Sequence, residues 1–220
     1  MKVGFLTIGQ SPRKDIMDDI GPILSDAGIE YSECGALDGL TRQQIELLRP
    51  ESKSDYVLVT RLLDGSEVKL SKTKIVSLLQ DCIVRMENRV DAIGLFCTGE
   101  FPELKSKRLL VEPSILLSKV VEALSPTSSI TILIPSADQE VELRKKWGLG
   151  SESAVIPISP YTSNINDFKM KLKDVKADQV VVMDCIGYSM EMKKLVSRIL
   201  MRPVILPRTL LASVLKEISK

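Results

Sequence analysis

The sequence predicts an α/β fold made of two similar lobes, and two observations support this prediction. Short apolar runs rich in β-branched residues alternate with helical stretches along most of the 220 residues, which is typical of parallel sheets. The order of segments also repeats, and each half ends a strand at a Cys-x-Gly turn, Cys97-Thr98-Gly99 or Cys185-Ile186-Gly187. We therefore expect two lobes related by an approximate two-fold axis, with a cleft between them that both cysteines face.

Local signals mark the elements of the first half. Ser11 is a suitable N-cap for a helix that starts at Pro12, and Thr41 with Gln44 forms a capping box. Asp64-Gly65 predicts the turn of a hairpin. We expect strands at residues 3–8, 29–33, 56–61, 67–70 and 93–96, and helices at residues 12–24, 42–48 and 75–86.

The second half follows the same order of elements. Pro113-Ser114 marks a helix start, and Pro135-Ser136 closes a strand. We expect strands at residues 129–134, 154–158, 180–183 and 204–206, and helices at residues 115–124, 139–147, 168–175, 190–200 and 209–218. Residues 1–111 plus 206–220 are predicted to form the first lobe, and residues 112–205 the second.

The composition excludes several classes of function. The chain contains no histidine, which rules out Ser-His-Asp triads, Cys-His dyads and the common histidine-based metal sites. The net charge of +1 predicts neither a nucleic-acid nor a membrane partner, and no apolar run approaches the ~20 residues that span a bilayer. The beginning of the chain does not resemble a signal peptide, and the four cysteines form no C-x-x-C pair, so we expect a cytoplasmic protein with free thiols.

Cys97 and Cys185 are the candidate catalytic residues. Each is predicted to lie at the tip of a strand beside the start of a helix, where the pKa of a thiol is usually lowered from about 8.5. The alternative is that both are small buried hydrophobic residues, which is our interpretation of Cys34 and Cys82. Asp184 directly precedes Cys185 and either tunes its ionisation or has a structural role.

Other residues near the expected cleft are suited to hold an anion. Arginines that follow strands can bind a carboxylate with both arms of the guanidinium group. Backbone N–H groups at helix starts and nearby hydroxyls can donate further hydrogen bonds, although such hydroxyls are more often helix caps and most arginines are solvated. The candidate substrate-binding residues are Gly9, Ser11, Arg13, Arg61, Thr98, Gly99, Ser136, Ile186, Gly187 and Arg208.

Several stretches along the whole chain resemble the AroM family and, through it, the wider aspartate/glutamate/hydantoin racemase superfamily. They are Leu6-Thr7-Ile8-Gly9, Gly35-Ala36-Leu37-Asp38-Gly39-Leu40, Val59-Thr60-Arg61-Leu62, Val111-Glu112-Pro113-Ser114, Met183-Asp184-Cys185-Ile186-Gly187 and the Cys97 turn. The resemblance implies two pseudo-symmetric flavodoxin-like lobes, each a mostly parallel sheet flanked by helices. It also implies chemistry without a cofactor, in which one cysteine from each lobe, here Cys97 and Cys185, serves as acid and base.

The sequence thus predicts a cofactor-independent, racemase-like isomerase, or a related decarboxylase, that acts on a small carboxylate by proton transfer between two cysteines. No metal or cofactor is expected, and the expected partner is a small anionic molecule. The alternative is a non-catalytic protein of the same fold that binds a small anion. A third alternative is a structural subunit of a larger assembly, and a homo-oligomer is compatible with each of the three.

Overall fold

Two four-stranded parallel sheets form the centre of the computed structural model, which describes residues 1–52, 54–124, 130–150 and 153–219. The first sheet, in the order β2-β1-β5-β6, contains β1 (Lys2–Thr7), β2 (Glu30–Gly35), β5 (Ala92–Phe96) and β6 (Leu109–Val111). The second, in the order β10-β9-β7-β8, contains β7 (Ile130–Ile134), β8 (Val155–Pro157), β9 (Val180–Met183) and β10 (Val204–Ile205). Numbered within its own sheet, each order reads 2-1-3-4, so the predicted pair of similar α/β lobes is confirmed.

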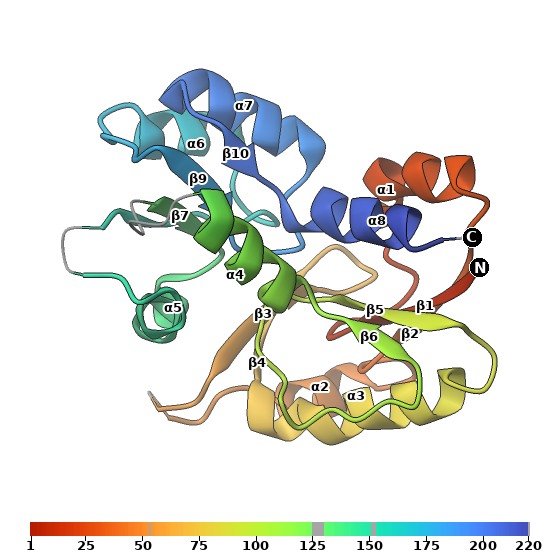
Figure 1. Cartoon of the computed structure of the whole chain (residues 1–220). Coiled ribbons are helices and arrows are strands. Elements are labelled where there is room, and N and C mark those ends of the chain that lie inside the picture. Colours follow the sequence, from red (N-terminus) through yellow and green to blue (C-terminus); the bar gives the residue numbers. More distant parts are fainter. Residues whose placement is uncertain (53, 125–129, 151–152, 220) are drawn as a thin grey trace.

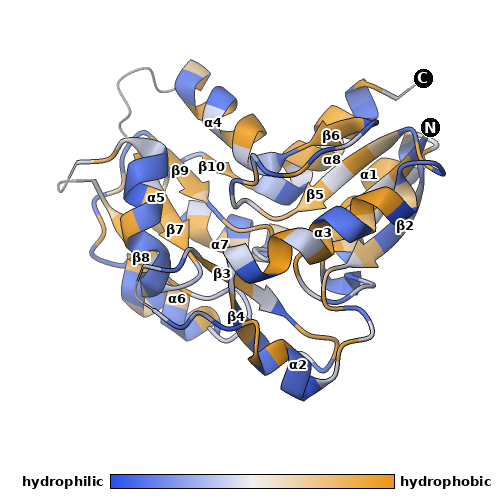
Figure 2. Ribbon diagram, turned by 90° about the horizontal axis from the view of Figure 1, so that it is seen from below, coloured by the Kyte–Doolittle hydropathy of each residue, from blue (hydrophilic) through white to orange (hydrophobic). Residues whose placement is uncertain are grey.

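Eight α-helices cover the sheets in the described part of the chain. They are α1 (Lys14–Asp26), α2 (Arg42–Glu46), α3 (Lys72–Met86), α4 (Pro113–Leu124), α5 (Glu140–Trp147), α6 (Ile165–Leu172), α7 (Met190–Leu200) and α8 (Pro207–Glu217). Helices α1 and α8 lie side by side over one face of the first sheet, and α3 covers the opposite face (Figure 1). Both ends of the chain lie close together beside α1 and α8 in Figures 1 and 2.

The sheets are buried on both faces, which explains their continuous apolar runs. In β1, Val3 and Phe5 pack with α1 and α8, whereas Leu6 points to the other face and packs with residues of α3. Strands β5, β7 and β9 are accordingly buried along their whole length, whereas the edge strand β2 is polar and exposed at its start. The helices carry hydrophilic outer faces (Figure 2). This packing fixes the carboxyl ends of the strands, where the candidate site residues begin.

The predicted hairpin is confirmed. Its two strands form a separate sheet, which contacts the second lobe. The hairpin pairs β3 (Val57–Arg61) antiparallel with β4 (Glu67–Ser71) around Asp64 and Gly65, and Gly65 has the positive φ of 88° that favours glycine. The Val57 carbonyl accepts a hydrogen bond from Gln139 Nε2 at 3.0 Å, and Glu67 accepts one from the Ser159 hydroxyl. The hairpin therefore ties the two lobes together beside the cysteine turns.

The structure corrects the start of the first helix. Helix α1 begins at Lys14 with Arg13 at its N-cap position, whereas the sequence predicted Ser11 as the cap, and the Ser11–Pro12 peptide bond is cis. Ser11 does not cap because its backbone N–H and hydroxyl both donate to the Asp38 carboxylate, at 2.7 and 2.6 Å. The Thr41 capping box is confirmed, while the three-residue strand β6 was not predicted.

Other predicted elements match closely. The bounds of β9 and α7 are those expected from the sequence, and α3, α4, β8, α6, β10 and α8 shift by a few residues at one or both ends. Residue 129, the expected first residue of the strand that is β7, lies outside the described residues. None of the described helices is long and apolar enough to span a membrane.

The expectation of free thiols is wrong for two of the four cysteines. Cys34, in β2, and Cys82, in α3, form a disulfide bond across 48 residues of chain, whereas Cys97 and Cys185 are free. Helix α3 packs on the face of the first sheet that Cys34 reaches, so tertiary packing brings the two sulfurs together. No spacing in the sequence indicates this pair.

Loss of the Cys34–Cys82 bond is expected to lower the free energy of unfolding by about 2–4 kcal/mol, because it releases a long loop in the unfolded chain. Urea unfolding of Cys34→Ser/Cys82→Ser against the oxidised wild type measures this loss. Alkylation of unreduced, denatured protein should label only Cys97 and Cys185. Labelling of all four cysteines would contradict the bond.

Candidate active site

The two Cys-x-Gly turns meet at one small cavity between the lobes. Cys97 follows β5 and Cys185 follows β9, which are the equivalent third strands of the two sheets. Both side chains line the same cavity of about 20 Å³, which has room for about one water molecule. The cysteines are 7% and 6% exposed, so the cleft that the sequence predicted is closed in this structure.

Burial sets the ionisation of both thiols. The pKa of Cys97 is raised to about 12, mainly by desolvation, and that of Cys185 is raised to about 11 for the same reason. The backbone N–H of Gly99 donates to Cys97 Sγ at 3.3 Å and that of Gly187 to Cys185 Sγ at 3.4 Å, which offsets part of the shift. The prediction of lowered thiol pKa values is therefore wrong for the closed cavity, because loss of water outweighs these hydrogen bonds.

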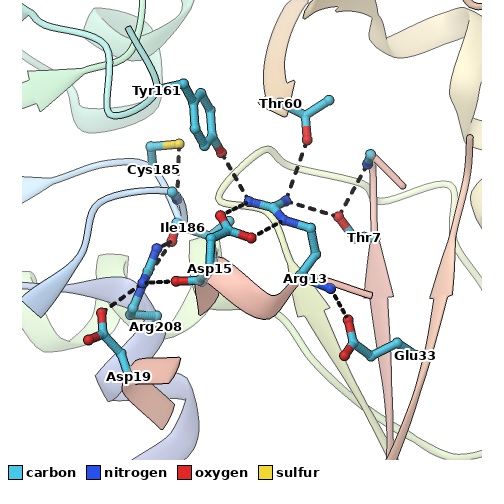
Figure 3. A network of polar contacts seen from close by, with 12 residues as sticks. Thr7, Arg13, Asp15, Asp19, Glu33, Thr60, Tyr161, Cys185, Ile186 and Arg208 are labelled. Carbon is cyan, nitrogen blue, oxygen red and sulfur yellow. Dashed lines mark hydrogen bonds and ion pairs between the residues drawn. The ribbon is translucent and has the colours of Figure 1, made fainter. Parts of the chain in front are cut away.

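Arg13 reaches the cavity from the loop that follows β1. Its backbone N–H donates to the Glu33 carboxylate at 2.6 Å, which anchors the loop to β2. Its side chain is 3% exposed, and Nη1 donates to the hydroxyls of Thr7 and Thr60 at 3.2 and 3.5 Å. These contacts place a fixed positive charge at the carboxyl edge of the first sheet, as Figure 3 shows.

A carboxylate already occupies the forked side of Arg13. Asp15 accepts from Nε at 2.9 Å and from Nη2 at 2.7 Å, which is the two-point geometry that suits a carboxylate (Figure 3). The side chain of Asp15 is partly exposed, whereas that of Arg13 is buried. The pair therefore shows that this guanidinium group can hold a carboxylate beside the cavity.

Tyr161 connects Arg13 to the second cysteine turn. Its hydroxyl accepts from Arg13 Nη2 at 3.4 Å, and a hydrogen bond from Tyr161 is among the contacts that lower the pKa of Cys185. A Cβ atom at Gly187 would lie 2.3 Å from the Tyr161 hydroxyl oxygen. The glycine of the turn is thus required so that the tyrosine ring can lie against it.

Lys146, a residue that the sequence analysis did not single out, bridges the two cysteine turns. Its Nζ donates to the Thr98 carbonyl at 2.9 Å and to both Asp184 oxygens at 2.9 and 3.1 Å. Trp147 Nε1 donates to Asp184 at 2.6 Å, and the side chains of Lys146 and Asp184 are 4% and 0% exposed. In the sequence, nothing distinguishes Lys146 from its neighbour Lys145, whose side chain is exposed.

The predicted site residues Thr98, Gly99 and Ile186 line the cavity together with the cysteines and Arg13. Arg208 lies behind it, fully buried, and donates to the Ile186 carbonyl at 2.8 and 3.0 Å. Its Nη1 donates to Asp19 and to the Asp15 carbonyl, at 2.7 and 2.8 Å (Figure 3). Arg208 thus holds the Cys185 turn against α1.

The remaining predicted residues lie outside the cavity. Arg61 is exposed and lines a separate pocket of about 490 Å³, which it shares with Arg13. Ser136 caps the 3-10 turn η1 (Ala137–Gln139) by accepting from the Asp138 N–H, and the Ser11 hydroxyl is held by Asp38. At Gly9 a Cβ atom would lie 2.5 Å from Thr60 Oγ1, so this glycine allows close packing of the loop.

The described residues contain no cluster of metal-binding side chains. Within the described residues, no three histidine, cysteine or carboxylate side chains are placed to share a metal ion.

Comparisons with known proteins agree with this architecture. The sequence profile of a family described as AroM protein matches residues 3–219. Among curated proteins, none matches the sequence. Among solved structures, the aspartate racemase of Picrophilus torridus matches with a TM-score of 0.59 and 14% identity, over 98% of this chain and 93% of that one.

Two further structures show the same likeness. Glutamate racemase from Aquifex pyrophilus has a TM-score of 0.59 and 14% identity, over 100% of this chain and 84% of that one. Arylmalonate decarboxylase has a TM-score of 0.61 and 9% identity, over 100% and 94%. At these identities the likeness establishes a shared fold.

Stability is expected to fall with pH above about 8.5, because the thiols of the unfolded chain ionise while Cys97 and Cys185 stay protonated in the folded protein. The contribution is fully present below that pH and is lost as pH rises toward 11, by about 1.4 kcal/mol per pH unit for each thiol. Urea unfolding at pH 8, 9 and 10 should show a steeper decline in the wild type than in Cys97→Ser/Cys185→Ser. Equal slopes would contradict the raised pKa values.

Lys146→Met is expected to destabilise the protein by about 3–5 kcal/mol, because it leaves the Asp184 carboxylate buried without its cation. It should also slow alkylation of Cys97, whose pKa Lys146 lowers. Lys145→Met is the matched control, since Lys145 is exposed and forms a surface ion pair with Glu142. A loss of stability no larger than that of the control would contradict the bridging role.

Proposed function

The chain belongs to the AroM family, whose profile spans residues 3–219, and we propose that it is a cofactor-independent, racemase-like isomerase acting on a small carboxylate substrate. Cys97 and Cys185 are the proposed acid and base. One observation carries the proposal: two free thiols from equivalent strand ends of two similar lobes line one cavity together with a buried arginine. Two thiols on opposite sides of one carbon can exchange its proton between faces.

The proposed reaction removes a proton from one face of the substrate carbon and adds a different proton to the opposite face. The carboxylate binds to the fork of Arg13, displacing Asp15, and its α-carbon lies between the two sulfurs. The thiolate of one cysteine removes the α-proton and becomes a thiol, while the charge spreads onto the carboxylate oxygens that Arg13 holds. The thiol of the other cysteine then protonates the opposite face and becomes a thiolate, so the product has inverted configuration and the two cysteines have exchanged protonation states.

Cys185 is the proposed first base. Arg13 and Tyr161 both lower its pKa, and Lys146 lowers that of Cys97, whereas Asp184 raises both. The pKa of Cys185, about 11, remains below that of Cys97, about 12. In the closed cavity, the raised pKa values keep the thiols of both cysteines protonated at neutral pH. Thiolate formation is therefore coupled to opening of the cavity, which readmits water and lowers the desolvation penalty.

The proposed opening occurs between the two lobes. We assign residues 1–111 plus 206–220 to one lobe and residues 112–205 to the other. Contacts from Lys146 to the Thr98 carbonyl and from Gln139 to the Val57 carbonyl cross this boundary and break when the lobes separate. Substrate reaches the cysteines only in that open form, because the closed cavity holds about one water molecule.

Decarboxylation is the one-sided form of the same chemistry. It needs a single thiol to protonate the carbanion left after loss of CO₂. The likeness to both aspartate racemase and arylmalonate decarboxylase supports a class that includes both reactions, because proteins with these two names share this fold.

A non-catalytic anion-binding protein is the second candidate, and the raised thiol pKa values favour it. In that case Arg13 holds an anion while both cysteines stay protonated. The two candidates differ in one measurable property, which is exchange of a carbon-bound proton with solvent.

Deuterium incorporation from heavy water into a panel of small chiral carboxylates tests the proposal. We expect incorporation with inversion in the wild type, and loss of inversion by at least about 10²-fold in Cys97→Ala and in Cys185→Ala. Cys34→Ser/Cys82→Ser is the control, because it removes cysteines outside the cavity. Unchanged inversion in both single variants would eliminate the two-thiol mechanism, and binding without exchange would support the second candidate.

A further inference from the structure

Gln139 lines the cavity that both cysteines line, and its side-chain oxygen is a hydrogen-bond acceptor without a partner in the described part of the chain. The residue is 9% exposed and lies at the end of η1, just before α5. In the closed form, its Nε2 donates to the Val57 carbonyl at 3.0 Å. Its Oε1 is buried and has no hydrogen-bond partner among the described residues. Buried polar atoms in native proteins are nearly always paired, so this one needs an explanation.

The orientation of the Gln139 amide is fixed by its neighbour. The Val57 carbonyl only accepts hydrogen bonds, so it must face the NH₂ group of the amide. A flipped amide would bring two acceptor oxygens together and would leave Nε2 unpaired. The unpaired group is therefore an acceptor, and it requires a donor.

The place of Gln139 in the fold matches that of Arg13. Arg13 lies in the loop after β1 and Gln139 in the segment after β7, which are the first strands of the two sheets. The cysteines follow the neighbouring third strands, β5 and β9. Ligands of parallel α/β sheets bind where the loops after two such neighbouring strands diverge. Each lobe thus supplies to the cavity a thiol after its third strand and a polar side chain after its first strand.

We propose that Gln139 Oε1 accepts a hydrogen bond from the substrate, and that the substrate is a small carboxylate bearing an O–H or neutral N–H donor. This inference rests on the proposed function for the carboxylate, which Arg13 binds, and it adds the second polar group of the substrate. A neutral donor fits better than an ammonium group, because Asp184, the acidic residue lining the cavity, already pairs with Lys146 and Trp147.

A site built around a buried acceptor discriminates by leaving that acceptor unpaired when the wrong ligand binds. An acid without the donor would bury Oε1 against an apolar group and lose affinity. The apolar side chains of Leu58, Phe96 and Leu143 also line the cavity, and in this proposal they contact the rest of the substrate. Gln139 is therefore a specificity-determining residue in this proposal.

Two pairs of probe acids test it: lactate against propionate and mandelate against phenylacetate. Members of each pair differ by one hydroxyl group. Binding is measured by isothermal titration calorimetry on Cys97→Ala/Cys185→Ala, so that turnover does not contribute. We expect the hydroxy acid of at least one pair to bind about tenfold more tightly, and this ratio to fall to about one when Gln139→Met is added.

Two further variants separate the acceptor from a general effect on folding. Gln139→Glu, protonated in its buried site, retains an acceptor oxygen and a donor for Val57, so it should keep the preference for the hydroxy acid. Gln80→Met is the matched control, since both polar atoms of Gln80 pair with Lys105 away from the cavity. A crystal structure of the mandelate complex should place the hydroxyl oxygen within about 3 Å of Gln139 Oε1, and this readout does not depend on the stability of any Gln139 variant.

The outcomes distinguish this inference from the proposed function. Equal binding of both members of each pair, or a preference that survives Gln139→Met, would overturn the role of Gln139 and leave the carboxylate site standing. A preference that depends on Gln139, without deuterium exchange by the wild type, would support the inference and contradict catalysis. Failure of all four acids to bind would overturn both.

Discussion

Burial of the cysteine turns away from bulk solvent is the constraint on which the rest of the site depends. It raises the pKa of both thiols and requires that every charge nearby be paired. Arg13 is paired with Asp15, and Lys146 with Asp184, each within a largely buried network. A buried charge without its partner costs several kcal/mol. Each pair lies within one lobe, and the hydrogen bond from Lys146 to the Thr98 carbonyl connects the two lobes.

The two lobes contribute equivalent positions with different chemistry. Strand order 2-1-3-4 in each sheet places a thiol after the third strand and a polar side chain after the first. The first lobe supplies Arg13, a cation for a carboxylate, and the second supplies Gln139, a neutral acceptor. A symmetric frame with unlike side chains can bind an asymmetric substrate in one orientation, which is what a stereochemical reaction at a single carbon requires.

Local patterns explain which parts of the structure were predictable. The capping box at Thr41, the hairpin at Asp64-Gly65 and the bounds of β9 and α7 follow from side chains within a few residues of one another. The cap at Ser11 failed because Asp38, distant in sequence, binds its hydroxyl and backbone N–H. The disulfide between Cys34 and Cys82 was missed for the same kind of reason, since only packing of α3 on the first sheet brings them together.

The sequence by itself determined the alternation of strands and helices, the repeat of that order and the position of one cysteine at each equivalent strand end. These are properties of short segments, and periodicity and turn chemistry encode them locally. Only the tertiary structure decided that the cavity is closed, that burial raises the pKa of both thiols, that Lys146 contacts both cysteine turns and that Gln139 lines the cavity. Hydrogen-bond partners at the cavity lie far apart in the sequence, 82 residues for Gln139 and the Val57 carbonyl and 148 residues for Arg13 and Tyr161, and no local pattern records such contacts.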